Sequence, residues 1–225
     1  MDRAEGNLAQ VLSDLWSGQL TGMPGVPFVV LLQEATRQVV EEAEAAAGTP
    51  PLSTFFAPVL TGPTRTSGNA ILSTVLLRSA RVVALPRERQ PRAAAVASVE
   101  IAGEDLFVAS VHLENRLGWL RGFFGDRARR RQAVALLDAL PQAGHGVLGG
   151  DMNTMLGPSE AALDVLLDRF PDTPEQPLRP TFRDRLVLDH LFFDVPDTWT
   201  VTHRVVDDRY GSDHHPVLGL ITFGG

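Results

Sequence analysis

The sequence has no cysteine, no lysine and no long uninterrupted apolar run. Without cysteine the chain forms neither disulfides nor thiolate metal sites, which fits a reducing compartment. The lack of a long apolar run excludes a helix that spans a bilayer, and the first residues lack the basic segment and apolar core of a secretion signal. We therefore expect no stable membrane insertion and favour the cytoplasm for the chain as given.

Positive charge is also scarce. The 20 residues in the Lys-plus-Arg count are all arginine, and 27 acidic residues leave a net charge of −7. Such a protein has no strongly cationic surface to grip nucleic acid or acidic lipid without help. A phosphate substrate remains compatible, because a bound divalent cation can supply positive charge locally. At 225 residues and 44% hydrophobic content, we expect one domain over residues 1–225 and a monomer.

Hydrophobic periodicity and turn residues place helices and strands along the chain. Apolar spacing predicts helices over 7–16 (with Asn7 as N-cap), 36–48 (stopped by Gly48), 126–140 and 158–170. Apolar runs between turn residues predict strands over 27–34, 69–74, 74–85, 93–103, 105–113, 145–153, 186–195, 199–206 and 216–223. Because the helices fall between more numerous strands, we predict two mainly antiparallel or mixed sheets packed face to face, with helices outside.

Polar residues stand where several of these strands end. In "LGGDMNT", Asp151 and Asn153 point to the same side if the chain stays extended, although an isolated D-x-N is more typical of an Asx-turn. Other strand ends carry Glu34, His112, Asp189, Asp213 and His214. Carboxylates beside apolar residues are costly unless they share a cation or pair with histidine. Oxygen ligands, with no Cys and no H-x-x-x-H spacing, favour Mg²⁺ or Mn²⁺ over Zn²⁺.

Six short segments occur in one order along the chain: "LLQE", "GNAILS", "SVHLEN", "GGDMNT", "LDHLFF" and "SDHHPV". Together they resemble the endonuclease/exonuclease/phosphatase superfamily of metal-dependent phosphodiesterases, over residues 28–223. The resemblance implies an α/β fold, a four-layer α/β/β/α sandwich of two mixed, mainly antiparallel sheets. It also implies a hydrolase that cleaves phosphodiester or phosphomonoester bonds with an activated water. A nuclease, with nucleic acid as its substrate, is favoured over a sphingomyelinase- or inositol-phosphatase-like enzyme.

The resemblance further assigns roles on the metal and water side of the reaction. Glu34 is implied as the principal metal ligand, and Asp213 as a residue that helps to bind the metal. Asp151 resembles the general base that orients the attacking water. Asn153 resembles a donor to the charge that builds on the phosphorus oxygens in the transition state.

Three further residues are implied on the phosphate side. His214 corresponds to the histidine that contacts the scissile phosphate. Asp189 corresponds to the carboxylate that orients this histidine, which would raise the pKa of His214 and keep it cationic. His112 is then a second imidazole beside the phosphate.

The start of the chain departs from the family pattern. Members usually begin with an interior strand whose T-x-N-like motif brings an Asn to the metal site, whereas Asn7 is expected here to cap a helix. We therefore expect an N-terminally truncated domain that lacks roughly 20 to 30 residues, with open edges on the neighbouring strands. A catalytically impaired or non-catalytic remnant of the fold stays as the alternative to an enzyme, and secretion stays open.

Overall fold

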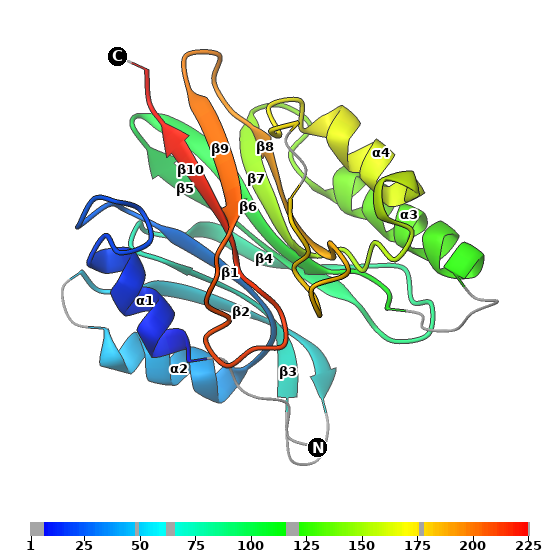
Figure 1. Cartoon of the computed structure of the whole chain (residues 1–225), viewed down its shortest axis with the longest axis horizontal. Coiled ribbons are helices and arrows are strands. Elements are labelled where there is room, and N and C mark those ends of the chain that lie inside the picture. The colour runs from blue at the N-terminus through cyan, green and yellow to red at the C-terminus, as the bar shows by residue number, and fades with distance from the viewer. Residues whose placement is uncertain (1–6, 48–49, 62–65, 116–121, 176–177, 225) are drawn as a thin grey trace.

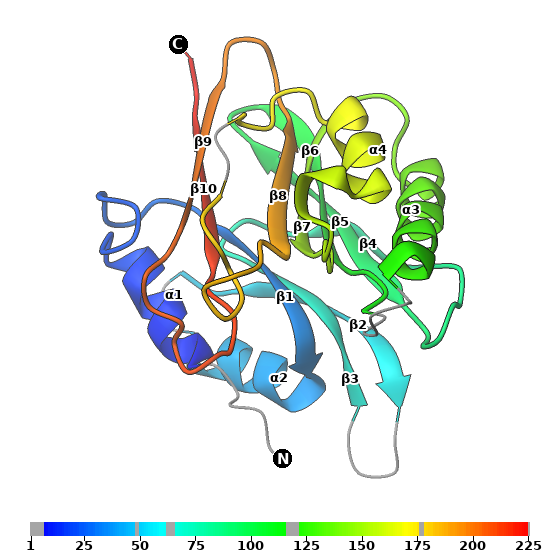
Figure 2. The ribbon, with the colours of Figure 1, turned by 45° about the vertical axis from the view of Figure 1, so that its right-hand side comes forward.

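A computed structural model describes residues 7–47, 50–61, 66–115, 122–175 and 178–224. Its elements form four layers, with one pair of helices outside each of two facing layers of strands (Figures 1 and 2). The predicted α/β sandwich is thus confirmed. No helix in these ranges is long and apolar enough to cross a membrane.

One strand layer is a continuous five-stranded sheet. Its strands lie in the order β4 (Arg78–Ala84), β5 (Ala93–Ile101), β6 (Glu104–His112), β7 (His145–Asp151) and β8 (Asp189–Asp194). β6 and β7 are parallel, and the other neighbours are antiparallel. Helices α3 (Gly122–Ala139) and α4 (Ala161–Arg169) cover its outer face over an apolar core that includes Phe107, Leu136, Leu148 and Phe170.

The other strand layer consists of two separate antiparallel sheets. One has the order β1 (Val29–Thr36), β3 (Thr66–Ser73), β2 (Ser53–Thr61), and the other pairs β9 (Thr200–Val205) with β10 (Val217–Thr222). Helices α1 (Leu8–Trp16) and α2 (Arg37–Ala46) pack on the outer face of the three-stranded sheet. A second apolar core, which includes Leu31, Val108, Leu191 and Ile221, fills the space between the strand layers.

The edges of β1 and β10 carry no further hydrogen-bonded strand among the described residues, since β1 pairs with β3 and β10 with β9. Both strands nevertheless approach Leu191 of β8 in the facing sheet. A β-carbon added at Gly149 would lie 2.5 Å from Leu191 Cδ2 and 2.8 Å from Leu31 Cδ1 of β1. A β-carbon added at Gly219 of β10 would lie 3.1 Å from Leu191 Cδ1. Leu191 therefore marks where the two halves of this layer approach each other.

Most predicted elements are present, with a few corrections. Asn7 caps α1, because its Oδ1 accepts a hydrogen bond from the Gln10 amide at 3.1 Å. The strand expected over 74–85 begins only at Arg78, and Gly48 lies outside the described residues. The sequence interpretation missed β2, where the register shifts after Pro58. Proline cannot donate a ladder hydrogen bond, so it weakens the strand pattern even at a sheet edge.

Candidate active site

Three candidate residues form a row at one end of the five-stranded sheet. His112 ends β6, Asp151 ends β7 and Asp189 begins β8, and the register pairs His112 with Asp151 and Asp151 with Asp189. Paired residues on neighbouring strands point to the same face. Gly150 permits the close approach of β7 to β6, because a β-carbon there would lie 1.9 Å from the Val111 carbonyl oxygen. Its φ of +146° also lies in the region that glycine tolerates.

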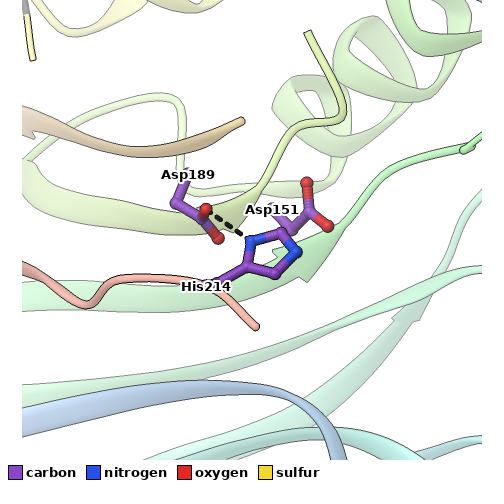
Figure 3. Close-up of side chains that lie close together, drawn as sticks. All are labelled: Asp151, Asp189 and His214. Carbon is purple, nitrogen blue, oxygen red and sulfur yellow. Dashed lines mark hydrogen bonds and ion pairs between the residues drawn. The ribbon is translucent and has the colours of Figure 1, made fainter. Parts of the chain in front are cut away.

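His214 joins this row from the loop before β10. Its Nδ1 lies 2.7 Å from Asp189 Oδ2, and its ring is directed towards Asp151 (Figure 3). Burial alone would lower the pKa of His214, but the hydrogen bond and charge of Asp189, aided by Asp151 and Asp213, raise it to about 9. His214 is therefore a cation at neutral pH, held beside two carboxyl groups.

The His214 loop is fastened to the first helix of the chain. The Asn7 amide donates to the Tyr210 carbonyl oxygen at 2.5 Å, and the Tyr210 hydroxyl donates to Asp14 Oδ2 at 2.8 Å. Both Asp14 and Tyr210 are buried. On the other side of His214, the His215 amide donates to the Thr181 carbonyl oxygen at 2.7 Å. The histidine is thus positioned from both directions along the backbone.

Asp151 is a buried carboxyl group with a raised pKa. Burial, followed by the charge of Asp189, raises its pKa to about 7, against the opposing effects of His214, the Asn153 backbone amide and Arg92. Its Oδ1 accepts the Asn153 amide hydrogen bond at 2.9 Å, and its Oδ2 lies 3.4 Å from His112 Nε2. The group can therefore accept or release a proton near neutral pH.

His112 is neutral at that pH. Burial, together with the positive charges of Arg92 and His214, lowers the pKa of His112 well below its ordinary value. A neutral imidazole beside a phosphate can still donate one hydrogen bond.

Asn153 follows Asp151 in a left-handed backbone conformation, with φ of 52°. Its side chain is buried, and its Nδ2 donates to the Leu113 carbonyl oxygen at 3.1 Å. An amide nitrogen has two donor hydrogens, so this bond leaves one for another acceptor. The role of Asn153 as a donor in the transition state stays a prediction.

Glu34 reaches the row from the opposite strand layer. It lies in the register shift between Leu32 and Ala35 of β1, with φ of 55°, and its side chain is 56% exposed. Its Oε1 is 3.9 Å from His112 Nδ1. A non-glycine residue at positive φ inside a strand is strained, and such strain is concentrated at functional sites. The bulge turns the Glu34 carboxylate towards the end of the five-stranded sheet.

The acidic groups suit a divalent cation. In the part of the chain that the structure describes, ligand atoms of Asp151, Asp189 and His214 lie within 4.8 Å of one another. Asp213 is exposed and adjoins His214 in the sequence. Neither Asp213 nor Glu34 belongs to this group of close ligand atoms, and their pairing as metal ligands stays a prediction. Because the charge of Asp189 helps to raise the pKa of Asp151, these carboxyl groups repel each other, and a cation would relieve that repulsion. Carboxylate oxygens are the ligands that Mg²⁺ and Mn²⁺ prefer.

The sequence interpretation missed a buried ion pair behind this site. Arg129 of α3 donates to both carboxylate oxygens of Glu160, at 3.0 and 2.5 Å, and its Nη1 donates to the Glu114 carbonyl oxygen at 3.3 Å. Glu160 also accepts the Leu156 amide hydrogen bond at 3.0 Å. The pair thereby fixes the loop that contains Asn153 and the short 3₁₀ helix Gly157–Ser159. Arg129 lies in an arginine-rich helix, where the sequence gives no sign that this arginine alone is buried.

Comparisons with known proteins agree with this architecture. Residues 4–214 match the model of a family described as the endonuclease/exonuclease/phosphatase family. No curated protein sequence matches the chain.

Three solved structures illustrate the similarity in fold. An endonuclease/exonuclease/phosphatase from Beutenbergia cavernae is 21% identical with a TM-score of 0.65, and the match covers 88% of this chain and 63% of that one. TDP2 from D. rerio, solved with a single-strand DNA product, is 18% identical with a TM-score of 0.64, over 96% of this chain and 92% of that one. The human Nocturnin catalytic domain, solved with a bound sulfate anion, is 18% identical with a TM-score of 0.59, over 95% and 84%.

Proposed function

Because the protein belongs to the endonuclease/exonuclease/phosphatase family, whose model matches residues 4–214, we propose that it is a divalent-metal-dependent hydrolase of phosphodiester bonds. The observation that carries this proposal is the cluster of Asp151, Asp189 and His214 at one end of the five-stranded sheet. It combines a carboxyl group that titrates near neutral pH with a cationic imidazole. Hydrolysis of a phosphodiester needs a group that takes a proton from the attacking water. It also needs positive charge beside the phosphate, because the negative phosphate oxygens repel the nucleophile.

The residues divide the reaction between them. Asp151 accepts a proton from water, whose oxygen forms a bond to phosphorus while the bond from phosphorus to the leaving oxygen breaks. His214, oriented by Asp189, donates a charge-assisted hydrogen bond to a phosphoryl oxygen. The second amide hydrogen of Asn153 donates a hydrogen bond to the negative charge that develops on the phosphoryl oxygens in the transition state.

A metal ion would be held on the acidic side of this cluster. We assign Glu34 and Asp213 as its ligands, and leave Asp151 to accept the proton and Asp189 to orient His214. When bound, Mg²⁺ or Mn²⁺ supplies positive charge to the phosphate and the leaving oxygen. This local charge matters here because the chain carries a net charge of −7.

Nucleic acid is the substrate class that we favour. TDP2, similar in fold, was solved with a single-strand DNA product, and Nocturnin with a sulfate anion, which is tetrahedral like phosphate. The retained acid and histidine set supports an enzyme over a non-catalytic remnant, because buried charges are costly to keep without a use.

The test measures cleavage of bis-p-nitrophenyl phosphate, p-nitrophenyl phosphate and a labelled single-stranded oligonucleotide, with Mg²⁺, Mn²⁺ or EDTA. We expect metal-dependent cleavage of the diester and the oligonucleotide, and its loss in Asp151→Asn. Asp138→Asn, an exposed change on α3, is the matched control and should keep full activity. Cleavage of the monoester alone would favour a phosphatase. If no substrate is cleaved with either metal, the proposal is wrong and the remnant interpretation gains support.

A further inference from the structure

Arg92 is buried at the same end of the five-stranded sheet as the candidate active site. It immediately precedes β5, and its carbonyl oxygen accepts the Leu85 amide hydrogen bond at 2.9 Å. The next carbonyl, of Ala93, accepts a hydrogen bond from Nδ2 of the buried Asn69 at 2.6 Å. Since β5 runs antiparallel to β6 and pairs Ala94 with Val111, this position adjoins the end of β6 at His112. Hydrogen bonds thus hold the carbonyl groups of Arg92 and Ala93, and this fixes the backbone from which the Arg92 side chain extends.

The guanidinium of Arg92 has two donors without a partner. The residue is 7% exposed, and its Nε and Nη2 are buried with no hydrogen-bond partner among the described residues. These two nitrogens carry the adjacent N–H groups that bind both oxygens of a phosphate or carboxylate side by side. A buried, unsatisfied donor pair is costly to fold, so its presence calls for a use.

The surrounding acids do not take up this donor pair. Arg92 makes no ion pair within 4.0 Å in the described ranges, although the charges of Glu114, Asp151 and Glu34 all act on it. Glu114 instead directs Oε2 to the backbone amide of Arg89 at 2.8 Å, and its Oε1 is buried without a partner. The guanidinium therefore has two buried, unsatisfied donors beside the candidate site.

Arg92 and His214 lie on opposite sides of the row of candidate residues. Arg92 adjoins the β5 and β6 side, and His214 is bound to Asp189 on the β8 side. His112 and Asp151 lie between them, on β6 and β7. A phosphate held above this row would meet a cation on each side, in a chain that is otherwise acidic.

We propose that Arg92 binds two oxygens of the substrate phosphate through Nε and Nη2. This role rests on the proposed phosphodiesterase function and extends it by one substrate-binding residue. A planar fork matches two phosphate oxygens, whereas a lysine ammonium supplies charge without that geometry.

The test uses inorganic phosphate as the probe, in EDTA, by calorimetry or by NMR titration of the wild type, Arg92→Met and Arg92→Lys. We expect phosphate affinity to fall at least about tenfold in both variants, because both lose the paired donors. Arg78→Met is the matched control, since Arg78 is exposed and pairs with Glu100 at 2.7 Å, and it should bind phosphate as the wild type does. Circular dichroism checks that each variant is folded. If Arg92→Met does not fold, the phosphate affinity of Arg92→Lys alone tests the proposal.

Stability and steady-state kinetics separate a binding role from a structural one. Without phosphate, Arg92→Lys should melt close to the wild type, because it keeps a cation beside Glu114 and Asp151. Added phosphate should raise the melting temperature of the wild type more than that of Arg92→Lys, because a ligand stabilises the folded state it binds. In the active enzyme, Arg92→Lys should raise KM for bis-p-nitrophenyl phosphate. Undetectable phosphate binding by the wild type, or unchanged phosphate affinity in Arg92→Lys, would overturn the role of Arg92. Arg92-dependent phosphate binding without any phosphodiester cleavage would instead overturn the proposed function and leave Arg92 as an anion-binding residue.

Discussion

The two strand layers differ in how completely their strands are paired, and the candidate active site takes residues from both. In the five-stranded sheet, β6 has a partner on each side and is buried from Leu106 to His112. In the other layer, β1 and β10 each have a partner on one side among the described residues, and their apolar side chains are only half-buried. Accordingly, the Asp151 side chain is 12% exposed and that of Glu34 is 56% exposed.

This difference indicates a division of labour within the site. Residues on fully paired strands are held rigidly, as electrostatic stabilisation of a transition state requires. Strands with one open edge and fewer buried contacts open locally at a lower free-energy cost. We therefore expect changes in the five-stranded sheet to act on turnover, and changes in the split layer to act on metal binding and stability.

The largest effect is expected at Asp151. Asp151→Asn should lower turnover about 100- to 10,000-fold, because an amide cannot accept the proton of the attacking water. The fold should persist, since an Asn oxygen can still accept the Asn153 amide hydrogen bond. Turnover is measured under single-turnover and steady-state conditions, and near wild-type rates would exclude Asp151 as the base.

The same variant should be more stable than the wild type at alkaline pH. Burial and Asp189 raise the pKa of Asp151 from 3.8 to about 7, so the folded state binds more protons than the unfolded state between these values. The free energy of unfolding therefore falls as pH rises from about 4 to 7, by at most about 4 kcal/mol. Melting curves should show Asp151→Asn above the wild type at pH 8 and level with it at pH 4, and a gain that is equal at both would contradict this linkage.

A smaller effect is expected for the partner of His214. Asp189→Asn removes the main group that raises the pKa of His214 to about 9, so the imidazole should lose its charge well below that value. At pH 8 turnover should fall roughly 30-fold, the loss of cationic fraction expected for a pKa near 6.5, with little change at pH 6. NMR titration of His214 in the metal-free protein measures the pKa directly.

The far end of β8 offers a matched control for that experiment. Asp194 also faces a histidine, with its Oδ1 2.9 Å from His145 Nδ1, but it lies at the end of the strand opposite to Asp189. Asp194→Asn should leave the pH profile of turnover unchanged. An equal shift of the profile in both variants would mean that Asp189 acts on general stability.

In the split layer, Glu34→Ala should weaken metal binding. The loss of one oxygen ligand should lower the affinity for Mg²⁺ or Mn²⁺ roughly tenfold, as measured by calorimetric titration of the metal. Glu34→Gly should bind as weakly but melt higher than Glu34→Ala, because glycine tolerates the φ of 55° at this bulge. Glu41→Ala, an exposed change on α2, is the control. Unchanged metal affinity in both Glu34 variants would remove Glu34 from the metal site.

The smallest effect is expected from closing the split layer. A strand-forming extension ahead of Met1, long enough to reach the edges of β1 and β10, should pair with both and raise the melting temperature by a few degrees, about 2 to 4 °C for each kcal/mol gained. Hydrogen exchange should slow at the outward-facing amides of these two strands, and metal-dependent turnover should rise. An extension of equal length rich in Gly and Ser is the control. Equal melting temperatures and exchange rates for the two extensions would show that the edges do not accept a strand.

The sequence predicted the fold well because the apolar patterns of both strand layers are strong. Helix α1 and its Asn7 cap follow from local spacing alone, as do the strands of the buried sheet. Strand β2 was missed because Pro58 interrupts its pattern. The split of the second layer was beyond local patterns, since it depends on which strand edges meet.

The candidate site was predictable only in part, for a similar reason. The strand end predicted at Asp151 is present, and the register brings His112 and Asp189 beside it. Asn153 is not extended beside Asp151: its amide donates to Asp151 Oδ1 and its φ is 52°, so the segment forms the Asx-turn that an isolated D-x-N favours. The positive φ of Glu34 and the unsatisfied donors of Arg92 arise from tertiary packing, which no local pattern encodes. Arg129 is buried whereas Arg130 beside it is exposed, because tertiary contacts and not the local sequence decide which arginine is covered.

The tether between the Tyr210 hydroxyl and Asp14 has a consequence for synthesis on the ribosome. The two residues are 196 positions apart, so the ribosome synthesises Asp14 long before Tyr210. Contacts of such separation form late in folding, and the cation at His214 follows Tyr210 by only four residues. A nascent chain that stalls before this point carries the clustered carboxyl groups of Asp151 and Asp189 without the positive charge of His214. Hydrolytic activity should therefore appear only in chains whose translation has passed His214.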